Sequence, residues 1–159
     1  MVEIQSIGIV GAGQMGNGIA HVAACAGFDV KLTDISQDAL DRAVATIEKN
    51  LGRMVKKDRI SETDAAAALA RIDCSTDMAT VSGCQLIIEA ATENVDLKYK
   101  IFESLSAVAS EDAILATNTS SISITSIAAK ATNPERVMGM HFMNPVPVMK
   151  LVELIRGLQ

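Results

Sequence analysis

The sequence has few of the residues on which several classes of protein depend. Aromatic side chains make up only 3% of the 159 residues, Trp is absent, and the formal net charge is −5. Because nucleic-acid-binding proteins use basic surfaces and aromatic platforms, we expect no nucleic-acid partner. No apolar run reaches the roughly 18 residues that a membrane-spanning helix needs. We therefore expect no membrane partner either.

Cysteine is also scarce. Cys25, Cys74 and Cys84 form no C-x-x-C pair and no metal-binding spacing, and their odd number argues against a disulfide framework. This usage favours a reducing compartment. The first residues, MVEIQSIGIVGAG, contain no basic region followed by an apolar segment and a cleavage site, so no signal peptide is expected. The sequence thus predicts a cytoplasmic protein without a metal site.

What the sequence does contain is a regular alternation of short β-rich runs and helical runs, with 49% apolar residues. This order is typical of parallel βαβ units. We predict strands at residues 4–10, 29–33, 71–74, 85–90, 113–117 and 136–140, with a further strand in 149–155. We predict helices at residues 14–26, 77–82, 94–109 and 123–131. The predicted fold is α/β, a Rossmann-like doubly wound domain over residues 1–159 with a mostly parallel sheet.

The segment between the second and third predicted strands is too long for one crossover helix. Its first half carries a continuous apolar stripe of helical periodicity, formed by Leu40, Val44, Ile47, Leu51 and Met54. SETDAAAALARI follows, and its serine, residue 61, is suited to cap a second helix. We therefore predict a helical hairpin inserted at about residues 37–70.

A glycine-rich turn follows the first predicted strand. Gly11, Gly13 and Gly16 form G-x-G-x-x-G between a strand and a helix, the context in which this motif indicates dinucleotide binding. Gly11 permits the tight turn, Gly13 lets a diphosphate approach the backbone, and Gly16 lets the helix pack closely on the strand. Gln14 and Met15 complete the turn and start the helix, whose N-terminus would hold the diphosphate.

Asp34 ends the second predicted strand, where a carboxylate binds the diol of an adenosine ribose. The carboxylate would repel a 2′-phosphate and no arginine adjoins it, so NAD is favoured over NADP, with FAD a lesser option. In the alternative interpretation, Asp34 only caps the helix that starts near Gln37. His21, on the helix after the turn, is interpreted as a packing or surface residue without a functional role.

Four stretches together resemble the L-3-hydroxyacyl-CoA dehydrogenases, including the bacterial 3-hydroxybutyryl-CoA dehydrogenases. They are GIVGAGQMGNGIA, EAATENVDLK, ATNTSSISIT and GMHFMNPVPVMKLVELI, and the resemblance covers the whole chain. It implies a reversible, NAD-dependent oxidation of an (S)-3-hydroxyacyl-CoA to a 3-oxoacyl-CoA.

His141 and Glu153 are the candidate proton-handling pair. His141 follows the predicted strand at 136–140, on the side of the sheet where open α/β folds bind ligands. A neutral imidazole is suited to accept the proton that a secondary alcohol loses on oxidation, and a carboxylate orients the ring. The segment NPVPV could reverse the chain and bring Glu153 to His141. From spacing alone the favoured interpretation is a strand-end histidine and a solvated glutamate, whereas the resemblance makes them the catalytic base and its partner.

The run ATNTSS offers short polar groups after the predicted strand at 113–117. The resemblance implies that Ser120 hydrogen-bonds the substrate oxygen and that Asn118 lies at the nicotinamide end of the cofactor. Serine 121 or 123 could also cap the following helix, and both roles are compatible.

Glu93 and Lys98 follow the predicted strand at 85–90. The resemblance implies that both contact the cofactor. From the residues alone, Glu93 is a helix-start acid favoured by the helix dipole and Lys98 is a surface charge.

The hairpin carries a local basic patch. Asn50, Arg53 and Lys57 fall on one helix face, with Lys56 and Arg59 beside them. Such a face is either simply solvated or a clamp for the phosphates of acyl-CoA. The resemblance assigns CoA binding to Lys57, with Asn50 in place of the family's usual serine.

The resemblance also implies a helical C-terminal domain that is missing from these 159 residues. In the family that domain closes the acyl pocket, supplies a catalytic asparagine and forms a homodimer, so we expect the isolated chain to be poorly active. Two alternatives are a related β-hydroxyacid dehydrogenase, which would use a catalytic lysine, and a non-enzymatic dinucleotide-binding protein on the same fold.

Overall fold

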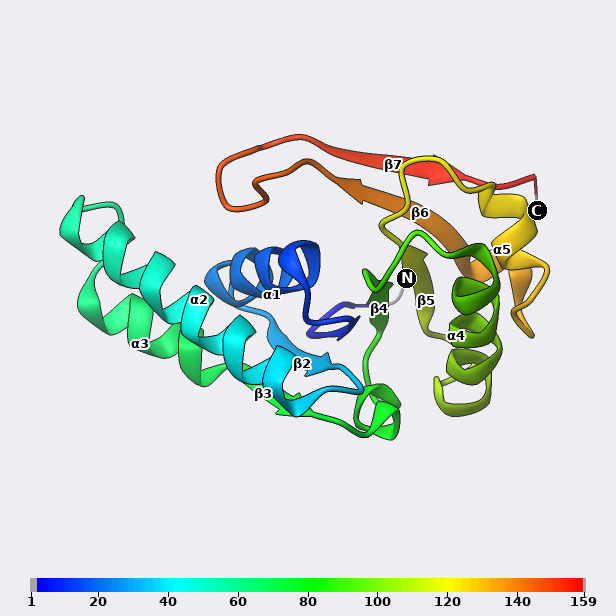
Figure 1. The fold of residues 1–159 in the computed structure, drawn as a ribbon, viewed down its shortest axis with the longest axis horizontal. Coiled ribbons are helices and arrows are strands. Elements are labelled where there is room, and N and C mark those ends of the chain that lie inside the picture. Colours follow the sequence, from blue (N-terminus) through cyan, green and yellow to red (C-terminus); the bar gives the residue numbers. More distant parts are fainter. Residues whose placement is uncertain (1–2, 159) are drawn as a thin grey trace.

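The computed structural model describes residues 3–158 and consists of one seven-stranded sheet between two layers of helices (Figure 1). The strand order is β3-β2-β1-β4-β5-β6-β7, the order of a doubly wound dinucleotide-binding fold with one added strand. The strands are β1 Ser6–Val10, β2 Asp29–Thr33, β3 Ile72–Ser75, β4 Leu86–Glu89, β5 Ile114–Thr117, β6 Val137–Phe142 and β7 Val152–Arg156. All adjacent pairs are parallel except β6 and β7. The predicted fold class is confirmed.

Each face of the sheet has its own core. On one side, apolar residues of β1, β2 and β4 pack against α1 Gln14–Cys25, α2 Gln37–Lys56 and α3 Glu62–Ala70. On the other, the sheet packs against α4 Val95–Val108, α5 Ile124–Ala128 and the 3-10 turn η1 Met78–Val81, while η2 Pro134–Arg136 leads into β6. Strands buried on both faces explain the apolar runs of the sequence. None of the helices within residues 3–158 is long and apolar enough to cross a bilayer.

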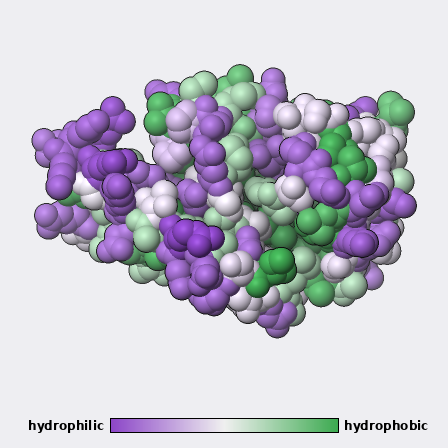
Figure 2. Space-filling view, viewed as in Figure 1, coloured by the Kyte–Doolittle hydropathy of each residue, from purple (hydrophilic) through white to green (hydrophobic). Residues whose placement is uncertain are grey.

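The inserted hairpin is present as predicted. The hydroxyl of Ser36 caps α2 and that of Ser61 caps α3. Leu40, Ile47 and Leu51 of the apolar stripe are buried against α1 and α3, and the other two stripe residues are half-buried. The hairpin projects beyond the sheet (Figure 1), and its outer end is hydrophilic (Figure 2).

Three elements differ from the predictions. The helix predicted at 123–131 ends at Ala128, because the N–H groups of Lys130 and Ala131 bond to carbonyls three residues back and tighten the last turn. The helix predicted at 77–82 is only a 3-10 turn. His141 lies inside β6 rather than after it, since pairing with β7 extends β6 to Phe142.

Candidate functional site

The glycine turn has the geometry that a diphosphate cradle requires. Gly11 has φ +105°, and a Cβ there would lie 2.7 Å from the Cα of Ala91. A Cβ on Gly16 would collide with the carbonyl oxygen of Gly11, so the turn and α1 touch directly. Gly13 faces open space and caps α1 without a side-chain hydrogen bond. The first N–H groups of α1 are therefore available to an anion, and the turn fits a dinucleotide.

Asp34 holds the glycine turn to the end of β2. Its Oδ2 accepts a hydrogen bond from the Ala12 N–H at 2.8 Å, and its Oδ1 accepts one from the Ser36 N–H at 2.9 Å. The alternative that Asp34 caps α2 is wrong, because the Ser36 hydroxyl accepts from the Ala39 N–H. A carboxylate has about four acceptor positions, so Asp34 can still receive a ribose hydroxyl.

A positively charged side chain that was not among the predicted site residues lies beside the glycine turn. Arg42 of α2 lines a small hollow together with Gly13, Gln14 and Asn17. Arg42 lies in the second helical turn of α2. Only the packing of α2 on α1 brings it close to the glycine-rich segment.

A second hollow, of about 140 Å³, forms a crevice at the carboxyl ends of β4 and β5. It is lined by Met15, Ala90, Ala91, Thr92, Glu93, Lys98 and Asn118. Asp34 lies on the opposite side of the glycine turn from this hollow, as the strand order β2-β1-β4-β5 requires. A dinucleotide whose adenosine ribose reaches Asp34 therefore extends its other half toward Glu93, Lys98 and Asn118.

Lys98 is buried and paired, so its interpretation as a surface charge is wrong. Its Nζ donates to both oxygens of Glu89, at 2.8 and 2.7 Å, and the two residues are 1% and 0% exposed. The Thr117 hydroxyl and the Ala91 N–H donate to the same carboxylate. One feature of the sequence could have predicted this pair. Glu89 is an acidic residue at the end of a buried strand, where its charge needs a partner.

A hydroxyl network joins the loops after β4 and β5. The hydroxyl of Thr119, which is 2% exposed, donates to Glu93 Oε2 at 2.7 Å and accepts the Ile122 N–H at 3.1 Å. Glu93 Oε1 lies 3.7 Å from Lys98 Nζ. Thr119 was not among the predicted site residues.

Asn118 and Ser120 alternate with the buried threonines of this segment. Asn118 Oδ1 accepts the Phe142 N–H at 2.8 Å and so ties β5 to the end of β6. Ser120 is exposed on the loop between β5 and α5, while Ser123 caps α5. The loop thus combines a helix cap with polar groups at the sheet edge, as predicted.

The predicted contact between His141 and Glu153 is present. The two residues are direct partners across the antiparallel β6–β7 pair, and His141 Nδ1 lies 2.8 Å from Glu153 Oε2. Their side chains are 20% and 50% exposed, so solvent reaches both. A carboxylate only accepts, so Nδ1 is the donor and a neutral ring keeps Nε2 as its basic nitrogen. Gln14 Nε2 donates to Asn144 Oδ1 at 3.1 Å, which links the start of α1 to the β6–β7 loop.

The two CoA candidates lie on the hairpin. Asn50 is half-buried on α2 and accepts a hydrogen bond from Arg53. Lys57 is exposed and forms the C-cap of α2, at the outer end of the hairpin (Figure 1). Their binding role stays a prediction.

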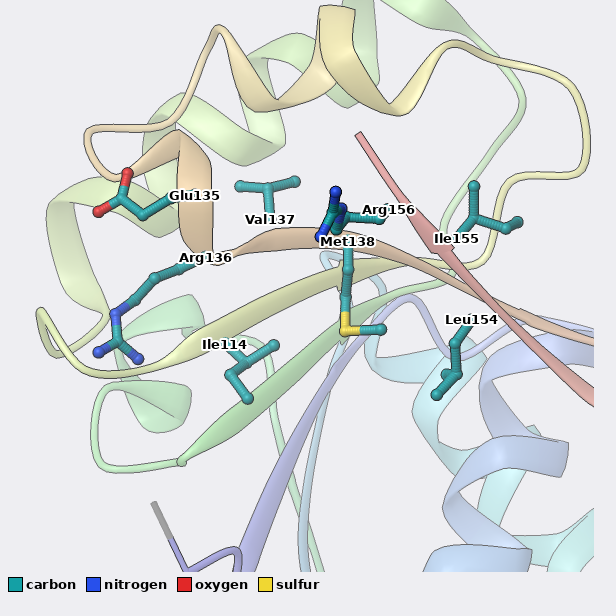
Figure 3. A pocket seen from close by; sticks show the side chains of 8 residues that line it. All are labelled: Ile114, Glu135, Arg136, Val137, Met138, Leu154, Ile155 and Arg156. Atoms are coloured by element: carbon teal, nitrogen blue, oxygen red, sulfur yellow. The ribbon is translucent and has the colours of Figure 1, made fainter. Parts of the chain in front are cut away.

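A larger hollow of about 610 Å³ lies at the opposite, amino-terminal edge of β5 and β6. Figure 3 shows Ile114, Met138 and Leu154 on one side of β6 and β7, with Arg136 to the left and Arg156 above Met138. It contains neither the glycine turn nor the His141–Glu153 pair, so it is not the dinucleotide site. No group of three or more His, Cys, Asp or Glu residues within 3–158 is placed to hold a metal ion.

His21 is a packing residue. It is 2% exposed on α1, and its Nδ1 has no hydrogen-bond partner among the described residues. Burial lowers the pKa of His21 below the ordinary value of 6.5.

Comparison with known proteins identifies the family to which the fold belongs. The family model for "3-hydroxyacyl-CoA dehydrogenase, NAD binding domain" matches residues 6–159. A 3-hydroxybutyryl-CoA dehydrogenase of Bradyrhizobium diazoefficiens is 54% identical over 155 residues, which cover 98% of this chain and 53% of the relative. A 3-hydroxyadipyl-CoA dehydrogenase of Escherichia coli is 45% identical over 158 residues, covering 99% of this chain and 33% of the relative.

Solved structures agree. The crystal structure of an (S)-3-hydroxybutyryl-CoA dehydrogenase from Ralstonia eutropha matches with a TM-score of 0.97 and 52% identity, over 99% of this chain and 56% of that one. This chain thus spans about half the length of these two 3-hydroxybutyryl-CoA dehydrogenases. With its glycine turn, its crevice and this similarity, the chain belongs to the family of NAD-binding domains of 3-hydroxyacyl-CoA dehydrogenases.

Proposed function

We propose that this chain is the cofactor-binding and proton-handling domain of an (S)-3-hydroxyacyl-CoA dehydrogenase. The reaction is the reversible conversion of (S)-3-hydroxyacyl-CoA and NAD⁺ into 3-oxoacyl-CoA, NADH and a proton, with 3-hydroxybutyryl-CoA as the favoured substrate. The observation that carries the proposal is the 2.8 Å contact between His141 and Glu153 at the edge of the sheet where the glycine turn lies.

In this proposal His141 is the general base. NAD⁺, which the glycine turn and Asp34 would hold, would supply the acceptor for the hydride of the hydroxyl-bearing carbon. His141 Nε2 takes the hydroxyl proton as the carbonyl forms, and the ring becomes an imidazolium. Glu153 accepts the hydrogen bond from Nδ1, fixes the ring orientation and offsets the new positive charge. In the reverse direction the same ring returns the proton to the oxygen.

Ser120 and Asn118 complete the reacting end of the site. The exposed Ser120 hydroxyl donates to the substrate oxygen and helps to hold it at His141. Asn118 uses its Oδ1 on the backbone of β6, so its amide nitrogen is free to face the crevice. Gln14 and Met15 flank the cofactor at the start of α1, Met15 beside Glu93 and Lys98 and Gln14 on the side of Arg42.

The hairpin serves as the CoA-binding element in this proposal. Lys57 contacts a CoA phosphate and Asn50 donates a hydrogen bond to the nucleotide, while the buried stripe of α2 anchors the hairpin to α1. We further propose that the acyl pocket and a homodimer contact lie outside these residues, which cover 53% of the Bradyrhizobium diazoefficiens relative. Cys25, Cys74 and Cys84 are free thiols, which fits the proposed cytoplasmic location.

The test uses the protein extended through a second domain like that of its relatives. NADH oxidation is followed with acetoacetyl-CoA and, in the other direction, NAD⁺ reduction with (S)-3-hydroxybutyryl-CoA. Turnover in both directions supports the proposal. An extended protein that binds NAD⁺ and acyl-CoA but transfers no hydride would refute it.

A further inference from the structure

We propose that the negative charge of the cluster formed by Glu89, Lys98, Glu93 and Thr119 raises the affinity of this domain for the oxidised cofactor relative to the reduced one. The inference concerns the charge that the protein presents to the nicotinamide ring. It depends on NAD binding and not on the identity of the acyl-CoA substrate.

The cluster lies where the nicotinamide half of the cofactor must pass. Asp34 and the glycine turn fix the adenosine ribose and diphosphate on the β2 and β1 side. The remaining half extends over the ends of β4 and β5, and both Glu93 and Lys98 line the hollow there. His141, at the end of β6, marks the far limit of this path.

The charges of the cluster do not cancel. Lys98 alone would repel a positively charged ring, but Glu89 holds its ammonium at 2.7 Å inside the protein and neutralises it. Glu93 adds a second carboxylate 3.7 Å from the same ammonium, so the cluster carries a formal charge of −1. The side chain of Glu93 is 55% exposed, and it is therefore the charge that faces the crevice. The nicotinamide ring is positive when oxidised and neutral when reduced, so this charge favours the oxidised form.

Thr119 is the positioning residue of the cluster. Its buried hydroxyl donates to Glu93 Oε2 at 2.7 Å and accepts a backbone N–H of its own loop. This contact keeps an otherwise exposed glutamate at the crevice instead of letting it turn into solvent. The Thr117 hydroxyl donates to the buried carboxylate of Glu89, at 2.7 Å.

The experiment measures the dissociation constants of NAD⁺ and NADH for the 159-residue chain by calorimetry. Glu93→Gln removes the charge and keeps an acceptor for Thr119. We expect it to weaken NAD⁺ binding about fivefold, the order of effect of one unit charge a few ångströms away at a half-solvated site. NADH binding should change less than about twofold. Glu135→Gln makes the same charge change at the opposite edge of the sheet and should alter neither constant.

Two further variants test the positioning role. Thr119→Val should lower the preference for NAD⁺ in the same direction as Glu93→Gln, and Thr119→Ser should restore it, because the hydroxyl returns. Thermal unfolding of each variant shows whether the fold is intact. Equal losses of NAD⁺ and NADH affinity in Glu93→Gln, or an unchanged ratio, would overturn the inference, even if the extended enzyme turns over acyl-CoA. Failure of turnover with an intact NAD⁺ preference would refute only the proposed function.

Discussion

Two acid–base pairs lie at the same edge of the sheet, and their burial separates their roles. Glu89 and Lys98 are fully buried and bound by additional hydrogen bonds, whereas His141 and Glu153 are partly open to solvent. A buried pair cannot exchange protons with a substrate, and breaking it leaves an unpaired charge. An exposed pair adds little to stability but can exchange protons. We therefore propose that the first pair builds the site and that the second performs chemistry in it.

The largest expected effect is on turnover, at the exposed pair. In the extended enzyme, His141→Gln should lower kcat roughly 10³-fold, because the general base is lost. NAD⁺ affinity, measured by calorimetry, should stay within about twofold of the unaltered enzyme. A His141→Gln enzyme with near-normal kcat would contradict the assignment of the base.

The next effect is on stability, at the buried pair. Lys98→Met should reduce the free energy of unfolding by about 3 kcal/mol or more, since Glu89 is left buried without its partner. Urea denaturation of the 159-residue chain measures it. Glu153→Gln is the matched control at the exposed pair and should cost less than about 1 kcal/mol. Adding Glu89→Gln to Lys98→Met should recover part of the loss; no recovery would mean that Lys98 acts through packing alone.

A smaller effect is expected at the hairpin. In the extended enzyme, Lys57→Ala should raise KM for acetoacetyl-CoA roughly fivefold through loss of one phosphate contact at an exposed site. KM for NADH should not change, and Lys100→Ala, on the exposed side of α4, serves as the charge-matched control. Equal increases in KM for acetoacetyl-CoA and for NADH would contradict a role of the hairpin in CoA binding.

The smallest effect concerns His21. Its folded-state pKa is lowered by burial, so below about pH 6.5 the unfolded chain binds a proton that the folded chain does not. Stability should therefore fall as pH decreases below 6.5, and it should be independent of this group above that pH. In His21→Leu the midpoint of thermal unfolding should fall less between pH 7.5 and pH 5.5. Parallel curves for the two proteins would assign the acid sensitivity to other groups.

The sequence predicted the parts of the site that follow local rules. G-x-G-x-x-G between a strand and a helix, the acid at the end of β2 and the apolar stripe of α2 each depend on neighbours in the chain, and the structure agrees with all three. The His141–Glu153 contact was also predictable, since a short reversal after β6 leaves few registers for the returning strand.

The parts that the sequence did not predict depend on long-range packing. Lys98 has the spacing of a surface residue, and only the placement of α4 against the end of β4 turns it toward Glu89. Thr119 gains its role when the loops after β4 and β5 meet. Arg42 reaches the glycine turn because α2 packs across α1. Such contacts join elements far apart in the chain, and no local pattern encodes them.

The most direct test of the proposed base is the tautomer of His141, because proton abstraction requires a free Nε2. The chain has only two histidines, so ¹⁵N-edited NMR of the imidazole rings resolves each one, with His21→Leu to assign them. At pH 8 we predict that His141 carries its proton on Nδ1, bonded to Glu153, and that Glu153→Ala abolishes this preference. A His141 ring protonated on Nε2 at that pH, unaffected by Glu153→Ala, would contradict the account.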